Sequence, residues 1–382
     1  MSIFDELQNC DVKRAMEKAE ESRNTRVIQA FELAAENSYY ELLKYYALFA
    51  LGRNTEYADE QIYKILTSDD SKVREENFLD DRWSLLLNML LIRIYYYFGG
   101  IISPKLKECI LSLLWERMKY ENDIAIARDS TWNIIGSENH DINSKACALI
   151  TSQIFMENED YKDRVYPDEG KGGGDGYWFH YMYKFMGSNT PEDFGPKGGA
   201  DMSDGKEYHA KEHYEQWVKF WKEYFKERVK RGFFLEMGAT GYMKWTMSFI
   251  SLIYEFCADK ELKATVKAFM DLVWCDWAVE QIDGVRGGSK TRFVFEEKEF
   301  TDDSMRQLAE FYFGGKGNAG HVYYFQLLSD YRLPELVWQL ASSREKLGSF
   351  EYISRKPGEE QALYPVSYTH LMTPLRRMRI PS

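Results

Sequence analysis

Apolar residues recur every three or four positions through most of this chain, the spacing that gathers them on one face of an α-helix. The segments 242–256 and 262–277 show the pattern clearly and are separated by a break at 258–260. Strand-like alternation is scarce. Because each amphipathic helix must bury its apolar face against a neighbour, the pattern predicts an all-α fold of antiparallel helix pairs.

The helical pattern extends over residues 1–364 without an internal repeat. Tetratricopeptide and HEAT arrays repeat at about 34 to 47 residues, and no such self-similarity is visible. We therefore expect one domain over 1–364, with the helix pairs closing toward a ring instead of stacking in an open solenoid. The ring is expected to be an incomplete (α/α)6-type toroid.

The charge balance limits the possible partners. The formal net charge is −12, which argues against nucleic-acid binding, since such domains are normally basic. The apolar segment 85–102 is interrupted by Asn88, Arg93, Gly99 and Gly100, so it fits a buried core helix better than a membrane span. No membrane segment is expected.

The two ends of the chain carry separate expectations. Residues 1–20 are too charged for a signal peptide, so a cytoplasmic location is the default expectation, and a missing leader would allow a periplasmic or secreted one. Residues 365–371 look like the translation of a transposase mosaic-end adapter. We therefore expect 365–382 to be a non-native tail and the natural protein to be truncated there.

One stretch departs from the helical pattern. Residues 167–206 contain ten glycines and three prolines. A loop of this length in a compact domain is usually a lid or a binding loop, and the simpler alternative is a surface excursion.

Two short motifs resemble known cofactor sites only formally. His209, Glu212 and His213 match the H-x-x-E-H spacing of zinc enzymes, but no third ligand can be identified. The segment 284–291 is close to a phosphate-binding loop, but Ser289 replaces a required glycine and a helix precedes it. We therefore expect no metal and no other cofactor.

A third motif is more promising. Glu138, Asn139 and His140 stand together at the predicted start of a helix, shortly after Trp132. Capping of that helix by Ser137 or Asn139 would explain one of these polar residues. The others are well placed to meet a ligand.

The segments 136–155, 232–236, 241–242 and 284–292 together resemble the helical domain of the alginate lyase and heparinase II/III-like polysaccharide lyases. The resemblance implies an (α/α) toroid with a cleft, usually followed by a β-rich domain. It also implies cleavage of a uronic-acid-containing polysaccharide by β-elimination, so the expected partner is an acidic polysaccharide or oligosaccharide.

The resemblance also implies roles for individual residues. Asn139 and His140 match the family's Asn-His pair and would neutralise the uronate carboxylate, while Tyr242 matches the family's downstream tyrosine and would transfer the proton. A tyrosine in this role needs a cationic neighbour, which Arg292 or Arg286 could supply. The expected substrate contacts are Trp132, Glu138, Glu236, Arg286 and Arg292.

Two other functions stay open from the sequence. An inverting glycoside hydrolase of the same fold would use Glu138 and Glu236, or the pair Asp302 and Asp303, as acid and base about 6.5 to 9.5 Å apart. A non-catalytic glycan-binding protein would show aromatic contacts but no organised cluster of asparagine, histidine, tyrosine and arginine.

Overall fold

The computed structural model is mostly helical, which confirms the all-α prediction. It describes residues 3–8, 10–80, 86–119, 122–128, 131, 138–166, 204–234, 241–287, 304–315, 323–342, 347–349, 351–353 and 377–379. The Gly-rich segment 167–203 and most of the expected tail lie outside these residues.

The helices of the first part of the chain are α1 (Ile3–Leu7), α2 (Val12–Glu21), α3 (Arg23–Asn37), α4 (Glu41–Leu51), α5 (Thr55–Leu66), α6 (Ser71–Glu76), α7 (Leu87–Phe98) and α8 (Pro104–Met118). The second part contains α9 (Ile124–Ala127), α10 (Glu138–Met156), α12 (Ala210–Arg231), α13 (Met243–Phe256), α14 (Lys260–Glu280), α15 (Ser304–Tyr312), the 3-10 helix η3 (Tyr323–Gln326) and α16 (Glu335–Ser342). Three two-stranded antiparallel ladders join β1 (Val165–Tyr166) to β2 (Tyr208–His209), β3 (Gln281–Ile282) to β4 (Val285–Arg286), and β5 (Glu351–Ile353) to β6 (Arg377–Arg379).

Local sequence signals explain where the helices begin and end. The side chain of Ser103 accepts a hydrogen bond from the Leu106 amide, and Pro104 occupies the first helical position of α8, where its missing N–H costs nothing. Asp259 caps α14 in the same way. Gly52 ends α4 in the left-handed conformation, which glycine adopts without strain.

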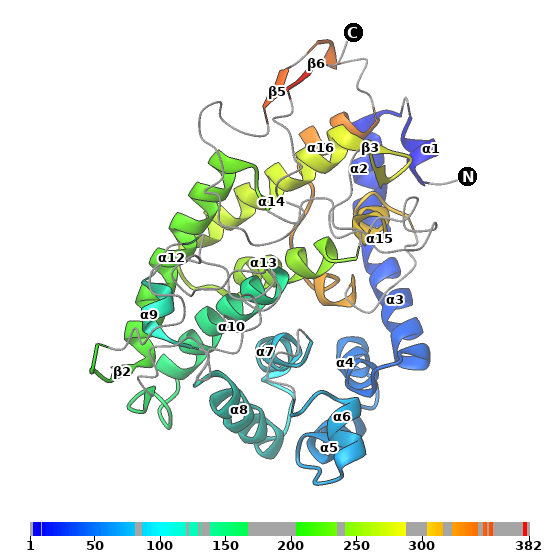
Figure 1. The fold of residues 1–382 in the computed structure, drawn as a ribbon. Helices are drawn as coiled ribbons and strands as arrows, with labels where there is room; N and C mark the ends of the chain where they lie inside the picture. Colours follow the sequence, from blue (N-terminus) through cyan, green and yellow to red (C-terminus); the bar gives the residue numbers. More distant parts are fainter. Residues whose placement is uncertain are drawn as a thin grey trace.

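Three helices, α7, α10 and α13, form the buried centre of the molecule (Figure 1). Sixteen of the 19 residues of α10 are buried, so this helix is covered on all sides. The predicted buried core helix at 85–102 is confirmed by α7. No described helix is both long and apolar enough to span a membrane.

The C-terminal ends of the three central helices meet, and α10 and α13 pack along each other in the same direction. Gln153 of α10 donates through Nε2 to the Tyr96 hydroxyl of α7 and to the Phe256 carbonyl of α13, both at 2.9 Å. The rings of Tyr96 and Phe256 stack with centroids 4.6 Å apart. Since Gln153 and Phe256 lie in the last turn of their helices and α10 packs along α13, the N-terminal ends of these two helices lie on the opposite side.

The other long helices pack around this centre. α8 contacts α7 and α10, α12 contacts α10, and α14 contacts α12 and α13. A turn of only three residues joins α13 to α14, which makes them an antiparallel pair.

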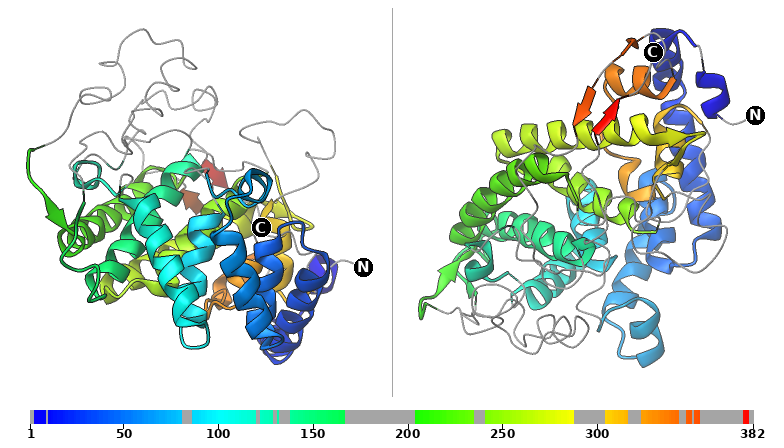
Figure 2. Two further views of the ribbon diagram at one scale, coloured as in Figure 1. Left: turned by 90° about the horizontal axis from the view of Figure 1, so that it is seen from below. Right: turned by 45° about the horizontal axis from the view of Figure 1, so that its top comes forward.

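The first and last helices of the described chain lie beside each other (Figures 1 and 2). The Phe4 ring of α1 packs against Trp277 and Phe313, with centroids 6.0 and 6.1 Å away. It also covers Gly284 in the β3–β4 turn, where φ is +77° and a Cβ would overlap the Phe4 ring. The N-terminal segment is therefore part of the same core as the C-terminal helices.

Candidate functional site

Five of the eight candidate residues can be placed in the structure. Glu138, Asn139 and His140 form the first turn of α10, Tyr242 directly precedes α13, and Arg286 ends β4. Trp132, Glu236 and Arg292 lie outside the described residues, as do Asp302 and Asp303. Because Asn139 lies inside the first turn, it is not the N-cap considered from the sequence.

Asn139 and Tyr242 lie at the same height on two neighbouring helices. Asn139 precedes Gln153 by fourteen residues, and Tyr242 precedes Phe256 by fourteen. Since Gln153 and Phe256 are hydrogen-bonded to each other, both residues stand about 21 Å from the same junction, at 1.5 Å per residue. The structure therefore places the Asn139–His140 pair and Tyr242 at the same end of one helix pair.

Helix geometry also shows which face of α10 carries Asn139. Fourteen residues rotate by nearly four full turns, at about 100° per residue. Asn139 therefore lies close to the face of Gln153, which contacts α7 and α13. Asn139 is fully buried, whereas His140 and Tyr242 are half-buried.

A group of buried charges, which we call the α10–α12 charge cluster, lies on a different face of α10. Its members are Glu138, Asp141 and Lys145 on α10 and Tyr224 and Arg228 on α12. Glu138 Oε1 lies 3.8 Å from Arg228 Nη2, and Asp141 Oδ1 lies 2.8 Å from Lys145 Nζ. The Arg228 guanidinium lies over the Tyr224 ring at 4.5 Å. Burial raises the pKa of Tyr224; Arg228 opposes this effect, whereas Glu138 and Asp141 add to it.

The H-x-x-E-H residues have structural partners. His209 precedes α12, and its backbone N–H donates to Glu212 Oε2 at 2.8 Å, one half of a capping box. His213 is buried, and its Nδ1 lies 3.0 Å from Asn122 Oδ1. Of the two histidines, only His213 lies inside α12. In the described part of the chain, no group of three or more His, Cys, Asp or Glu side chains could hold a metal ion.

The environment of His213 keeps it neutral. Burial lowers the pKa of its imidazole from 6.5 to about 3, and the charge of Arg128 contributes in the same direction. The Tyr166 ring lies 4.3 Å from the imidazole, and Trp217 donates to the same Asn122 oxygen at 2.6 Å. Asn122 lies just before α9, His213 and Trp217 lie on α12, and Tyr166 lies on β1. These contacts therefore connect three parts of the fold.

Arg286 is engaged by two carboxylates. Its Nη2 lies 2.7 Å from Asp276 Oδ2, and its Nε donates to Glu280 Oε2 at 2.7 Å. All three side chains are largely buried. The β3–β4 hairpin follows α14 directly, and this ion-pair group attaches the hairpin to α14.

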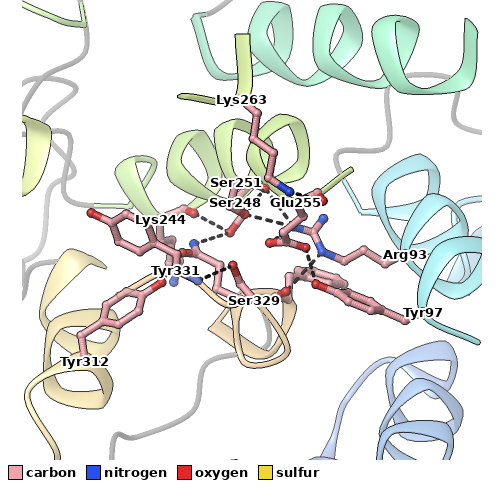
Figure 3. Close-up of polar contacts among 12 residues, drawn as sticks. Arg93, Tyr97, Lys244, Ser248, Ser251, Glu255, Lys263, Tyr312, Ser329 and Tyr331 are labelled. Carbon is pink, nitrogen blue, oxygen red and sulfur yellow. Dashed lines mark hydrogen bonds and ion pairs between the residues drawn. The ribbon is translucent and has the colours of Figure 1, made fainter. Parts of the chain in front are cut away.

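A second group of buried polar side chains joins α7 to α13 (Figure 3). We did not identify it as a site from the sequence. Arg93 on α7 donates to Glu255 Oε1 at 3.2 Å, to Ser251 Oγ at 3.0 Å and to the Phe325 carbonyl at 3.2 Å. The Tyr97 hydroxyl donates to Glu255 Oε2 at 2.8 Å. Burial raises the pKa of Glu255, while Arg93 and Tyr97 oppose the rise. The sequence signal was Arg93 itself, a charge inside an apolar helix that requires a partner.

No family model, no curated protein and no solved structure matches this chain. The geometry must therefore carry any functional conclusion. It offers an amide, an imidazole and a phenol at the N-terminal ends of two parallel helices, with the neighbouring acidic residues paired internally. Such a set can bind an anionic group and move a proton beside it.

Proposed function

We propose that this protein is a polysaccharide lyase that cleaves a uronic-acid-containing polysaccharide by β-elimination. Asn139 and His140 would bind the uronate carboxylate, and Tyr242 would act on the adjacent carbon and the leaving oxygen. The observation that carries the proposal is the common height of Asn139 and Tyr242 on α10 and α13. The resemblance of the surrounding motifs to polysaccharide lyases agrees with it.

We also propose that the helices form an incomplete (α/α)6-type toroid. Three features support this arrangement: the C-terminal ends of α7, α10 and α13 meet inside, α8, α12 and α14 pack around them, and α2 contacts α16. In a toroid of this kind the N-terminal ends of the inner helices would share one rim. The proposed site would then lie on that rim.

The reaction requires a proton to leave C5 of the uronate while the C4–oxygen bond breaks. A C4=C5 double bond forms, and the leaving oxygen takes up a proton. Negative charge develops on the carboxylate during proton removal, and donors fixed in position stabilise it better than mobile water does. The Asn139 amide and the His140 imidazole are such donors, and the positive ends of the α10 and α13 dipoles favour the same charge. Tyr242 in its phenolate form would take the C5 proton as the base, and the resulting phenol would return that proton to the leaving oxygen.

The hydrolase alternative is less well supported by the position of Glu138. Its carboxylate lies 3.8 Å from Arg228 Nη2, on the side of α10 that faces α12, whereas a general acid or base must reach the glycosidic oxygen or a water molecule. Reducing-end formation without ultraviolet absorbance would favour this alternative.

The test is ultraviolet absorbance from the unsaturated uronate product, measured with purified protein on alginate, polygalacturonate, hyaluronan and heparan sulfate. We expect absorbance with at least one polymer and a loss of about 100-fold or more in His140→Ala and Tyr242→Phe. Tyr39→Phe is the matched control, because Tyr39 is 89% exposed and loses the same hydroxyl. Absence of absorbance with all four polymers, in folded protein, would reject the proposal for these substrates.

A further inference from the structure

We infer that Arg228 is a positioning residue of the proposed site, because it neutralises Glu138 directly beside Asn139 and His140. The inference rests on the proposed function and adds a residue that no motif of the sequence identifies. Arg228 lies on α12 and does not belong to either helix that carries the catalytic candidates.

The contacts of Arg228 join the segment before α10 to the first residue of α10. Its Nη2 donates to the Thr131 carbonyl at 3.4 Å and lies 3.8 Å from Glu138 Oε1. The guanidinium is held in place by the Tyr224 ring. With 1% of its side chain exposed, Arg228 sits behind the first turn of α10 and away from solvent.

The charges in the α10–α12 charge cluster balance in pairs. Lys145 lies 2.8 Å from Asp141 one turn further along α10, and Arg228 lies 3.8 Å from Glu138. Removal of Arg228 would take one positive charge away from the buried Glu138 carboxylate, and breaking a buried pair in this way is costly. The added negative charge would stand next to Asn139 and two residues from His140, where it would repel the substrate carboxylate.

This arrangement predicts that Glu138 acts through its charge balance with Arg228 and not as an acid or base. The two possibilities differ in a double variant. If Arg228 and Glu138 act by neutralising each other, removal of both charges should restore the activity and stability that are lost when Arg228 alone is removed. If Glu138 transfers a proton, the double variant stays as inactive as the single Glu138 variant.

The experiment compares Arg228→Met, Arg228→Lys, Glu138→Gln and the double variant Arg228→Met/Glu138→Gln. Initial rates over a range of polymer concentrations give kcat and KM on the polymer that the wild type cleaves, and denaturant unfolding without substrate gives the midpoint. We expect Arg228→Met to lower kcat/KM about 100-fold and to lower the midpoint. Arg228→Lys keeps the charge and should show a smaller decrease in kcat/KM and in the midpoint. The double variant should recover most of the decrease in both quantities.

Two results would overturn the inference. An active wild type whose double variant is no better than Arg228→Met would reject the positioning role alone. A wild type without elimination activity would reject the proposed function, and the positioning role would fail with it. The two failures are distinguishable because the wild-type assay is read first and the midpoints are measured without substrate.

Discussion

The two ends of the α10–α13 pair use polar side chains differently. At the C-terminal end, Gln153 bonds to both neighbouring helices, and close to it Arg93 and Glu255 join α7 to α13. At the N-terminal end, the charge of Glu138 is paired toward α12, on a face of α10 different from that of Asn139. Polar groups that connect the central helices fix the positions of these helices along one another. The charged groups at the N-terminal end bond toward α12 instead, so they do not occupy the N-terminal ends of α10 and α13, where we propose that the reaction takes place.

The largest effect on stability is expected from Arg93→Leu. The substitution leaves the Glu255 carboxylate, 2% exposed, without its cation and removes bonds to two other elements. Breaking a buried ion pair costs about 3 to 5 kcal/mol in free energy of unfolding, measurable by urea denaturation. The double variant Arg93→Leu/Glu255→Leu should lose clearly less. Equal losses would mean that the carbonyl contacts of Arg93, and not its charge, hold α7 and α13 together.

The next largest effect on the free energy of unfolding is expected from a fall in pH, because of His213. This residue is buried like the group around Arg93 but carries no charge. Its pKa is lowered to about 3 in the folded protein, so the unfolded chain binds the proton more readily. The resulting stability is fully present above pH about 6.5 and is lost as the pH falls toward 3. By pH 4 the loss should reach about 3 kcal/mol.

A comparison of unfolding free energies at pH 7 and pH 4 for the wild type and His213→Gln checks this. Glutamine keeps an amide donor for Asn122 and cannot titrate. The difference between the two proteins should grow in favour of the variant as the pH falls, because the carboxylates contribute equally to both. Parallel pH profiles would show that His213 is protonated in the folded protein.

A smaller effect on stability is expected from Gln153→Ala. This substitution removes the contacts at the C-terminal end that fix the position of α10 along α13. Two hydrogen bonds donated by the amide and one accepted from the Ala258 N–H disappear. Unsatisfied buried groups of this kind cost about 2 kcal/mol. Gln339→Ala is the control, because its bond to Glu335 is exposed to solvent. If the common height matters for the proposed reaction, Gln153→Ala should also lower kcat, although it lies about 21 Å from the site.

The fold was largely predictable because helical periodicity is a local property. The predicted segments 242–256 and 262–277 correspond to α13, Met243–Phe256, and α14, Lys260–Glu280. The meeting of the C-terminal ends of the central helices was not predictable, because Gln153 contacts residues 57 and 103 positions away. No local pattern encodes that choice of neighbours.

The site was predictable only in its residue types. The cluster at 138–140 and Tyr242 stood out as polar residues at the start of apolar helices. The burial of Glu138 beside Arg228 depends on how α12 packs against α10, and the α12 sequence around Arg228 looks like an ordinary charged helix end. Arg93 attracted attention only as an interruption of an apolar segment, since its partners come from α13 and η3.

The smallest change in stability is expected from two tyrosine-to-phenylalanine substitutions, one near each end of the central helices. Tyr46 of α4 is fully buried, and its hydroxyl has no hydrogen-bond partner among the described residues, so Tyr46→Phe should alter the free energy of unfolding by less than about 0.5 kcal/mol or stabilise the protein slightly. Tyr242→Phe should cost at most about 1 kcal/mol. The two variants should nevertheless separate in the elimination assay, where only Tyr242→Phe loses activity. Equal activity in both variants would place the proton transfer on a residue other than Tyr242. Equal loss of activity in both would mean that the N-terminal ends of α10 and α13 depend on the buried group around Arg93 as much as on their own side chains.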